Sequence, residues 1–153
     1  VPLMDIVETP VAGLPAVIAS GGDVQQELLY VTDAARTVVN AAFAEATEHQ
    51  VFNLGSPTAH TMHEMAEVVR DRIPGAEIEI GDGPDPLYGL GGRLDLTRAG
   101  SEIGHEITYT LEEGIDAWIE FLRSRPKSEQ AVGQGGLSTI STDIPTTEQT
   151  TER

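Results

Sequence analysis

The order of the predicted secondary-structure elements constrains the fold of this chain more than any other feature. Short apolar runs bounded by turn residues predict strands, as does a run in which isoleucine alternates with glutamate; these cover residues 16–19, 28–31, 51–54 and 77–80. A helical pattern separates the second run from the third, and another follows the third. The middle of the chain therefore has the order strand, helix, strand, helix, which predicts a parallel crossover and an α/β fold.

Two of the predicted helices begin with a capping box, in which a hydroxyl and a carboxylate three residues later satisfy the first backbone groups of the helix. Thr61 and Glu64 form one such pair, and Thr110 and Glu113 form the other. A shorter helix is expected from a cap at Asp95 through Glu102, with Gly104 ending it in the left-handed conformation. These signals predict three helices in the second half of the folded region.

A further helix is expected after a cap at Asp33 or Thr32, because apolar residues follow at three-and-four spacing. These residues are Ala35, Val38, Val39, Ala42, Phe43 and Ala46. Most of them are small, so we expect this helix to pack closely against a sheet.

The composition changes near residue 124. From 124 to 153 the chain is rich in Ser, Thr, Gln and Gly, a composition that buries too little apolar surface to offset the entropy of ordering it. We therefore expect one folded domain over 1–123 and a disordered tail over 124–153. Because the chain begins with Val1, we expect either processing or a piece of a longer polypeptide.

The charge of the chain excludes several classes of function. Nine Lys and Arg residues stand against 25 Asp and Glu residues, which gives a net charge of −16. Nucleic acid and anionic membranes need clustered basic residues, so neither is an expected partner. The longest uncharged stretch, 9–22, contains two prolines and is too short to cross a bilayer. Because there is no cysteine, we expect a cytoplasmic location.

Catalytic and metal chemistry is also restricted. His60 and His63 have a spacing that can place both on one helix face, but no third ligand follows at an obvious spacing, so we expect no metal site and solvent-exposed histidines. The single lysine is Lys127, which follows a proline and so cannot belong to a phosphate-binding loop. None of the three tyrosines has a lysine four residues later, which excludes a Tyr-x-x-x-Lys acid/base pair. We therefore assign no catalytic residue.

A series of motifs in a fixed order resembles a known family. Gly21-Gly22-Asp23 leads to Leu28-Leu29-Tyr30-Val31-Thr32-Asp33-Ala34-Ala35, and then come Val51-Phe52-Asn53-Leu54-Gly55-Ser56, Asp95-Leu96-Thr97-Arg98-Ala99 and Tyr109-Thr110-Leu111-Glu112-Glu113-Gly114-Ile115. This order is similar to that in the C-terminal portion of an extended short-chain dehydrogenase/reductase, of the NAD-dependent nucleotide-sugar epimerase/dehydratase family. The resemblance covers residues 1 to 123.

The resemblance implies a Rossmann-type architecture: the last strand, helix and strand of the cofactor sheet, followed by a small α/β substrate-binding domain. It implies that a missing N-terminal Rossmann part carries the NAD or NADP site and the Tyr-x-x-x-Lys pair. The parent would be an epimerase or dehydratase similar to UDP-glucose 4-epimerase, compatible with a homodimer. This chain alone is expected to be inactive and to bind no cofactor.

The same resemblance places the substrate contacts at Gln26, Tyr88, Gly92 and Arg93, and leaves the cofactor-binding residues unknown. Gln26 stands where many members of the family have an arginine that meets the pyrophosphate. A second family arginine falls in the stretch 82–86, which contains no arginine, and Arg93 is a candidate to replace that one. Because Gln26 supplies no charge and 82–86 contains no arginine, a related dehydrogenase part that acts on a smaller hydroxylated substrate is an alternative. A separate alternative is a free-standing acidic α/β module that binds a partner without catalysis.

Overall fold

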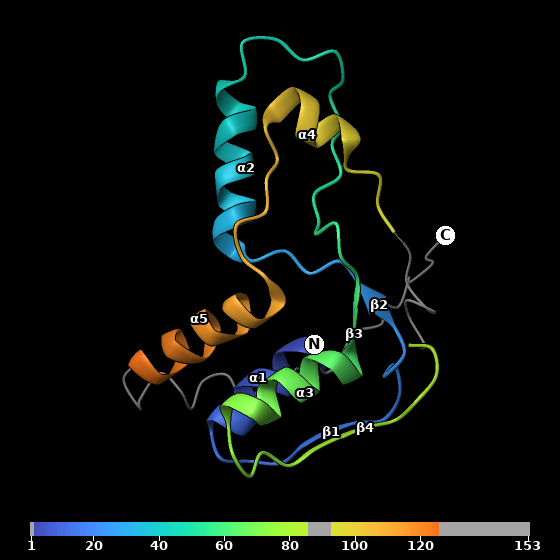
Figure 1. Ribbon diagram of the computed structural model, residues 1–153, viewed down its shortest axis with the longest axis vertical. Helices are drawn as coiled ribbons and strands as arrows, with labels where there is room; N and C mark the ends of the chain where they lie inside the picture. Colours follow the sequence, from blue (N-terminus) through green and yellow to red (C-terminus); the bar gives the residue numbers. More distant parts are fainter. Residues whose placement is uncertain (1, 86–92, 126–153) are drawn as a thin grey trace, which may run out of the picture.

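The computed structural model describes residues 2–85 and 93–125. The helices and strands are α1 (Pro2–Val11), β1 (Ala16–Ile18), β2 (Gln25–Gln26), α2 (Val31–Phe43), β3 (His60–Thr61), α3 (Met62–Arg72), β4 (Ile78–Ile80), α4 (Thr97–Ile103) and α5 (Leu111–Ser124). In Figure 1, helices α1, α3 and α5 lie together near the β1–β4 pair, whereas α2 and α4 lie side by side at the other end of the molecule. The predicted α/β class is confirmed.

The hydrophobic core lies between the three packed helices and the β1–β4 pair. Apolar side chains from all five elements meet there, among them Ile6, Val7, Ala16, Met65, Val69, Ile78, Ile115 and Ile119. The predicted apolar stripes of α3 and α5 supply much of this core. Helix α1 was not predicted, although its Ile6 and Val7 are fully buried.

Two short sheets connect these helices. β1 and β4 are parallel, with Ala16 opposite Ile78 and Ile18 opposite Ile80, which confirms the first and last predicted strands. β2 and β3 are antiparallel, with Gln26 opposite His60. The second sheet places residues 25 and 26 directly beside the start of α3.

The predicted helix ends are confirmed where they rest on local signals. Both capping boxes are formed, at Thr61 with Glu64 and at Thr110 with Glu113. Gly104 ends α4 with a φ of 62°, in the left-handed region. The cap of α4 is shifted, because α4 begins at Thr97 and Asp95 accepts a hydrogen bond from the Thr97 N–H.

The start of α2 differs from the prediction. The helix begins at Val31 with Tyr30 as its cap, and no side chain caps it. Thr32 and Asp33 lie inside its first turn. Asp33 cannot cap the helix because its carboxylate binds a distant segment of the chain, as described below.

The strands predicted over 28–31 and 51–54 are wrong for this chain, because within the described residues neither run pairs with another strand. The predicted packing of the α2 apolar face is also wrong here, since Val38 is 61% and Phe43 is 83% exposed. Both errors have one cause: neither sheet of the described residues includes these two runs. A strand needs a hydrogen-bonded neighbour, and an apolar helix face needs a sheet to cover it.

His105 connects α2 to the segment that leads toward β3. Its Nδ1 lies 2.8 Å from the Thr37 hydroxyl, and its Nε2 lies 2.8 Å from the Gly55 carbonyl oxygen. The His105 ring therefore connects α2 and the end of α4 to the extended segment that precedes β3. Across the two described ranges, no helix is both long enough and apolar enough to span a lipid bilayer.

Candidate functional site

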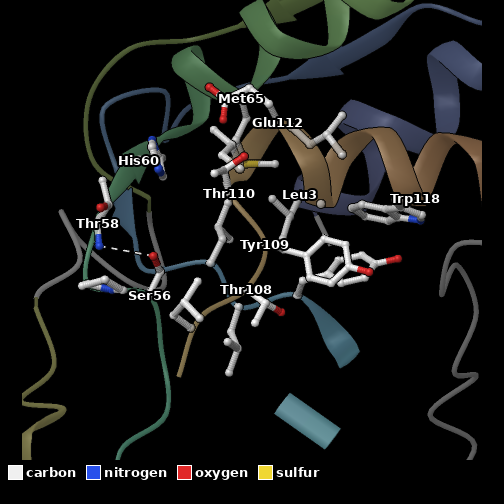
Figure 2. Close-up of a pocket in the computed structure, with 18 residues that line it drawn as sticks. Leu3, Ser56, Thr58, His60, Met65, Thr108, Tyr109, Thr110, Glu112 and Trp118 are labelled. Carbon is white, nitrogen blue, oxygen red and sulfur yellow. Dashed lines mark hydrogen bonds between the residues drawn. The ribbon is translucent and has the colours of Figure 1, made fainter. Parts of the chain in front are cut away.

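A cavity of about 420 Å³ opens where the first turns of α3 and α5 meet the extended segments before α2 and β3 (Figure 2). Its lining includes Leu3, Leu28, Tyr30, Ser56, Pro57, Thr58, His60, Met65, Thr108, Tyr109, Thr110, Glu112, Ile115 and Trp118. A cavity of this size with a mainly apolar lining and a few polar groups is the usual form of a small-molecule site.

Aromatic side chains form one wall of this cavity. Tyr30 and Tyr109 are in contact, with ring centroids 4.4 Å apart and planes tilted by 36°. Trp118 and Leu3 continue the same wall (Figure 2). Such a wall suits the apolar face of a ring or another apolar group.

Asp33 fixes the position of this wall. Its carboxylate is 1% exposed and accepts hydrogen bonds from the backbone N–H groups of Thr108, at 3.0 Å, and Tyr109, at 3.1 Å. The Thr108 hydroxyl and the Arg36 guanidinium donate to the other oxygen. Burial by itself would raise the pKa of Asp33, but these four donors outweigh it and lower the pKa below its usual value. The aspartate is therefore a charged anchor for the segment that carries Tyr109.

Polar side chains gather at the opposite end of the cavity. His60 Nδ1 lies 3.6 Å from Glu64 Oε2, and Glu112 lies near both His60 and Thr110. The pKa of Glu112 is lowered, first by its own backbone N–H and then by the Thr110 hydroxyl, so this carboxyl is charged near neutral pH. His63 faces a different carboxylate, with its Nε2 3.1 Å from Asp82 Oδ1.

The histidines are more enclosed than expected, since the side chains of His60 and His63 are 25% and 39% exposed. The two rings do not converge on a common point, because each has its own acidic partner. Within residues 2–85 and 93–125, no group of three or more His, Asp or Glu side chains is arranged to hold a metal ion.

Two of the four predicted substrate contacts, Gln26 and Arg93, are not among the residues that line the cavity, but each contacts a lining residue; we call them, together with Glu27 between them, the Gln26–Arg93 rim. Gln26 lies in β2 opposite His60, and Arg93 donates from Nη2 to the carbonyl oxygen of Pro57, both partners being cavity residues. Tyr88 and Gly92 lie outside the described residues.

Sequence reasoning missed Glu27 as a functional candidate. Its side chain is only 4% exposed, and its carboxylate lies 3.6 Å from Arg93 Nε and accepts a hydrogen bond from the Leu94 N–H at 2.9 Å. No local pattern reports this contact, since the partners are more than 60 residues apart.

The glycine turn at 21–23 does not have the form of a dinucleotide-binding turn. A dinucleotide is bound by an open glycine-rich turn between a parallel strand and the start of a helix. Here β1 leads through the turn at 21–23 into strand β2, and the His63 ring occupies the place that a side chain on Gly22 would take. No step of a hydride-transfer reaction can be assigned to these residues.

Comparison with known proteins identifies related chains. No protein-family model matches the sequence. The chain is 30% identical over 118 residues to UDP-glucuronic acid decarboxylase 1 of Arabidopsis thaliana, a match that covers 75% of this chain and 26% of the relative. The chain thus spans about a quarter of that relative's length.

Solved structures share the fold. A partial-consensus L-threonine 3-dehydrogenase superposes with a TM-score of 0.70 at 21% identity, covering 81% of this chain and 42% of the other. The UDP-glucuronic acid 4-epimerase of Bacillus cereus, in complex with UDP-glucuronic acid and NAD, superposes with a TM-score of 0.70 at 15% identity, covering 80% and 40%. The chain therefore has the α/β fold of part of an NAD-dependent extended short-chain dehydrogenase/reductase, and it is related in sequence to the UDP-glucuronic acid decarboxylases.

Proposed function

We propose that this chain is the substrate-binding part of an NAD(P)-dependent sugar-nucleotide epimerase or dehydratase. In this proposal a cofactor-binding Rossmann part of the same enzyme holds the NAD or NADP and supplies the proton-transferring side chains. The 153-residue chain shapes the cavity in which the substrate lies. It has no activity by itself, because the groups that move a hydride and a proton are on the other part.

The observation that carries this proposal is the uncovered apolar face of α2. Val31, Val38, Val39 and Phe43 are all more than half exposed, and Val51, on the unpaired segment 51–54, is 77% exposed. Soluble proteins rarely leave such a set of large apolar side chains in water unless it forms an interface. A sheet packed on this face would cover α2 and would give the runs at 28–31 and 51–54 neighbours to pair with.

The substrate side of the proposal rests on the Gln26–Arg93 rim and the cavity beside it. The Gln26 amide can donate two hydrogen bonds to a ligand, and Arg93 can orient a ligand through its remaining N–H groups. We propose Gln26, Tyr88, Gly92 and Arg93 as substrate contacts.

A second candidate is a related dehydrogenase part that acts on a smaller hydroxylated substrate without a nucleotide. Two observations favour it: Arg93 is paired with the buried Glu27, and an L-threonine 3-dehydrogenase is among the structures with this fold. A free-standing binding module is less well supported, because such a module would cover the α2 face.

Association of the purified chain tests the proposal. We expect the chain to self-associate in light scattering and to bind a hydrophobic dye. Phe43→Ser should reduce both effects, because Phe43 belongs to the α2 face. Phe121→Ser is the matched control, since Phe121 is also exposed, at 57%, but lies on α5. A monomeric chain that binds no dye, or equal effects of the two substitutions, would refute docking through α2.

A further inference from the structure

The Gln26–Arg93 rim contains a buried negative charge that needs a counterion. Glu27 is 4% exposed, and the hydrogen bond from the Leu94 N–H satisfies only one of its oxygens. Charged groups at this depth are stable when they are paired. Among the described residues, Arg93 is the cation in contact with the Glu27 carboxylate. The positive charge of Arg93 is therefore already balanced by Glu27 within the protein.

Arg93 also has a fixed place in the chain. Its Nε faces Glu27, and its Nη2 donates to the Pro57 carbonyl oxygen, so one guanidinium joins the segments that contain residues 27, 57 and 93. The Arg93 side chain is still 67% exposed, and solvent therefore reaches the rest of the guanidinium. A ligand that reaches the rim can form hydrogen bonds with Arg93, but it meets a pair whose net charge is zero.

The described residues around the Gln26–Arg93 rim do not give it a net positive charge. Gln26 is neutral; His60, which lies opposite Gln26 in the β2–β3 pair, faces Glu64, and His63 faces Asp82. The better-buried arginines of the described chain have partners elsewhere, Arg36 with Asp33 and Arg72 with Asp116. A pyrophosphate would bring two negative charges to a rim that offers no net positive charge to offset their desolvation.

We propose that Glu27 is a specificity-determining residue that neutralises Arg93 and so makes this rim select uncharged, hydroxylated ligands over phosphate-bearing ones. The inference rests on the second candidate of the proposed function, a smaller hydroxylated substrate without a nucleotide, because it assumes that the rim faces that substrate; a rim that favours phosphate would instead support the sugar nucleotide. It narrows the substrate class to a neutral polyol, sugar or hydroxylated metabolite that hydrogen-bonds to Gln26 and Arg93.

Glu27→Gln tests this inference with little disturbance of the fold. The amide oxygen of glutamine can still accept from the Leu94 N–H, whereas the negative charge beside Arg93 is removed. We would titrate UDP into the wild-type chain, Glu27→Gln, Arg93→Gln and the double variant by calorimetry, at low and at physiological salt. Thermal unfolding of each variant, followed by circular dichroism, reports whether the fold is kept.

The expected result is that Glu27→Gln binds UDP more tightly than the wild type by roughly threefold to tenfold at low salt, as one uncompensated charge would provide. The gain should shrink at physiological salt and should disappear in the double variant, which removes the guanidinium as well. Equal or weaker binding of UDP by a folded Glu27→Gln variant would overturn the inference.

A measurement on the wild type keeps the inference testable if Glu27→Gln fails to fold. UDP binding that is weak and nearly independent of salt, and that Arg93→Gln leaves unchanged, supports a neutral rim. Tight UDP binding that falls steeply with salt and is lost in Arg93→Gln overturns it. Neither outcome depends on docking through α2, so failure of the proposed assembly and failure of the Glu27 assignment are separate results.

Discussion

The buried carboxylate of Asp33 accepts a hydrogen bond from the backbone N–H of Tyr109, at 3.1 Å across 76 residues of sequence. Tyr109 is the ring that contacts Tyr30, the residue that caps α2. One side chain at the start of α2 therefore sets the position of a cavity wall that belongs to the start of α5.

Asp33→Asn should destabilise the chain by about 2–4 kcal/mol, because a buried charged acceptor is replaced by an amide whose NH2 group faces other donors. Urea unfolding followed by circular dichroism measures this change. Asp116→Asn is the matched control: Asp116 is an exposed partner of Arg72, and its substitution should cost about 1 kcal/mol or less. Equal costs for the two substitutions would contradict the anchoring role of Asp33.

The same carboxylate should give the chain an acid-sensitive stability. The pKa of Asp33 is lowered in the folded state, so its stabilising contribution is complete above the unfolded-state pKa of about 4 and is lost as the pH falls through the lower folded value. The urea midpoint of the wild type should therefore fall more between pH 6 and pH 3 than that of Asp33→Asn. Asp95 and Glu102, whose pKa values are also lowered, remain in both proteins and act equally on both midpoints. Parallel pH profiles would show that Asp33 does not contribute.

The capping box of α5 offers a test of the helix boundaries. Thr110→Ala should cost about 1 kcal/mol, because the Glu113 N–H loses the hydroxyl that accepts its hydrogen bond. Thr32→Ala should cost much less, since Thr32 lies in the first turn of α2 and does not cap it. A larger loss from Thr32→Ala than from Thr110→Ala would place the start of α2 at Asp33.

Gly22 and Gly100 should respond to alanine in opposite directions. A Cβ on Gly22 would overlap the His63 ring, so Gly22→Ala must displace the histidine from Asp82 and should cost about 1–3 kcal/mol. A Cβ on Gly100, inside α4, would meet nothing closer than the His105 carbonyl oxygen at 3.9 Å. Gly100→Ala should therefore leave stability unchanged or raise it by up to about 1 kcal/mol. Equal losses in thermal unfolding would contradict this local packing.

The sequence predicted those features whose causes are local. The capping boxes at Thr61 and Thr110 and the left-handed Gly104 each depend on a few neighbouring residues, and all three are present. Segments 28–31 and 51–54 have the composition of strands, but strand formation needs a pairing partner that the described residues do not supply.

The candidate site was harder to predict, because its contacts join distant segments. Asp33 has the residue type and position of a helix cap, yet Thr108 and Tyr109 compete for its oxygens. Gln26 and Arg93 were selected by family resemblance, and their role as substrate contacts stays a prediction; neither lines the cavity, although each contacts a residue that does. The burial of Glu27 and its contact with Arg93 are visible only when the chain is folded, because the two residues are far apart in the sequence.

We propose that this chain binds the substrate, whereas another part of the enzyme holds the cofactor. Calorimetric titration of NAD into the purified 153-residue chain tests it most directly. We predict no binding heat, because the turn after β1 leads to a strand and is closed by His63. Saturable binding of NAD with micromolar affinity would contradict this account.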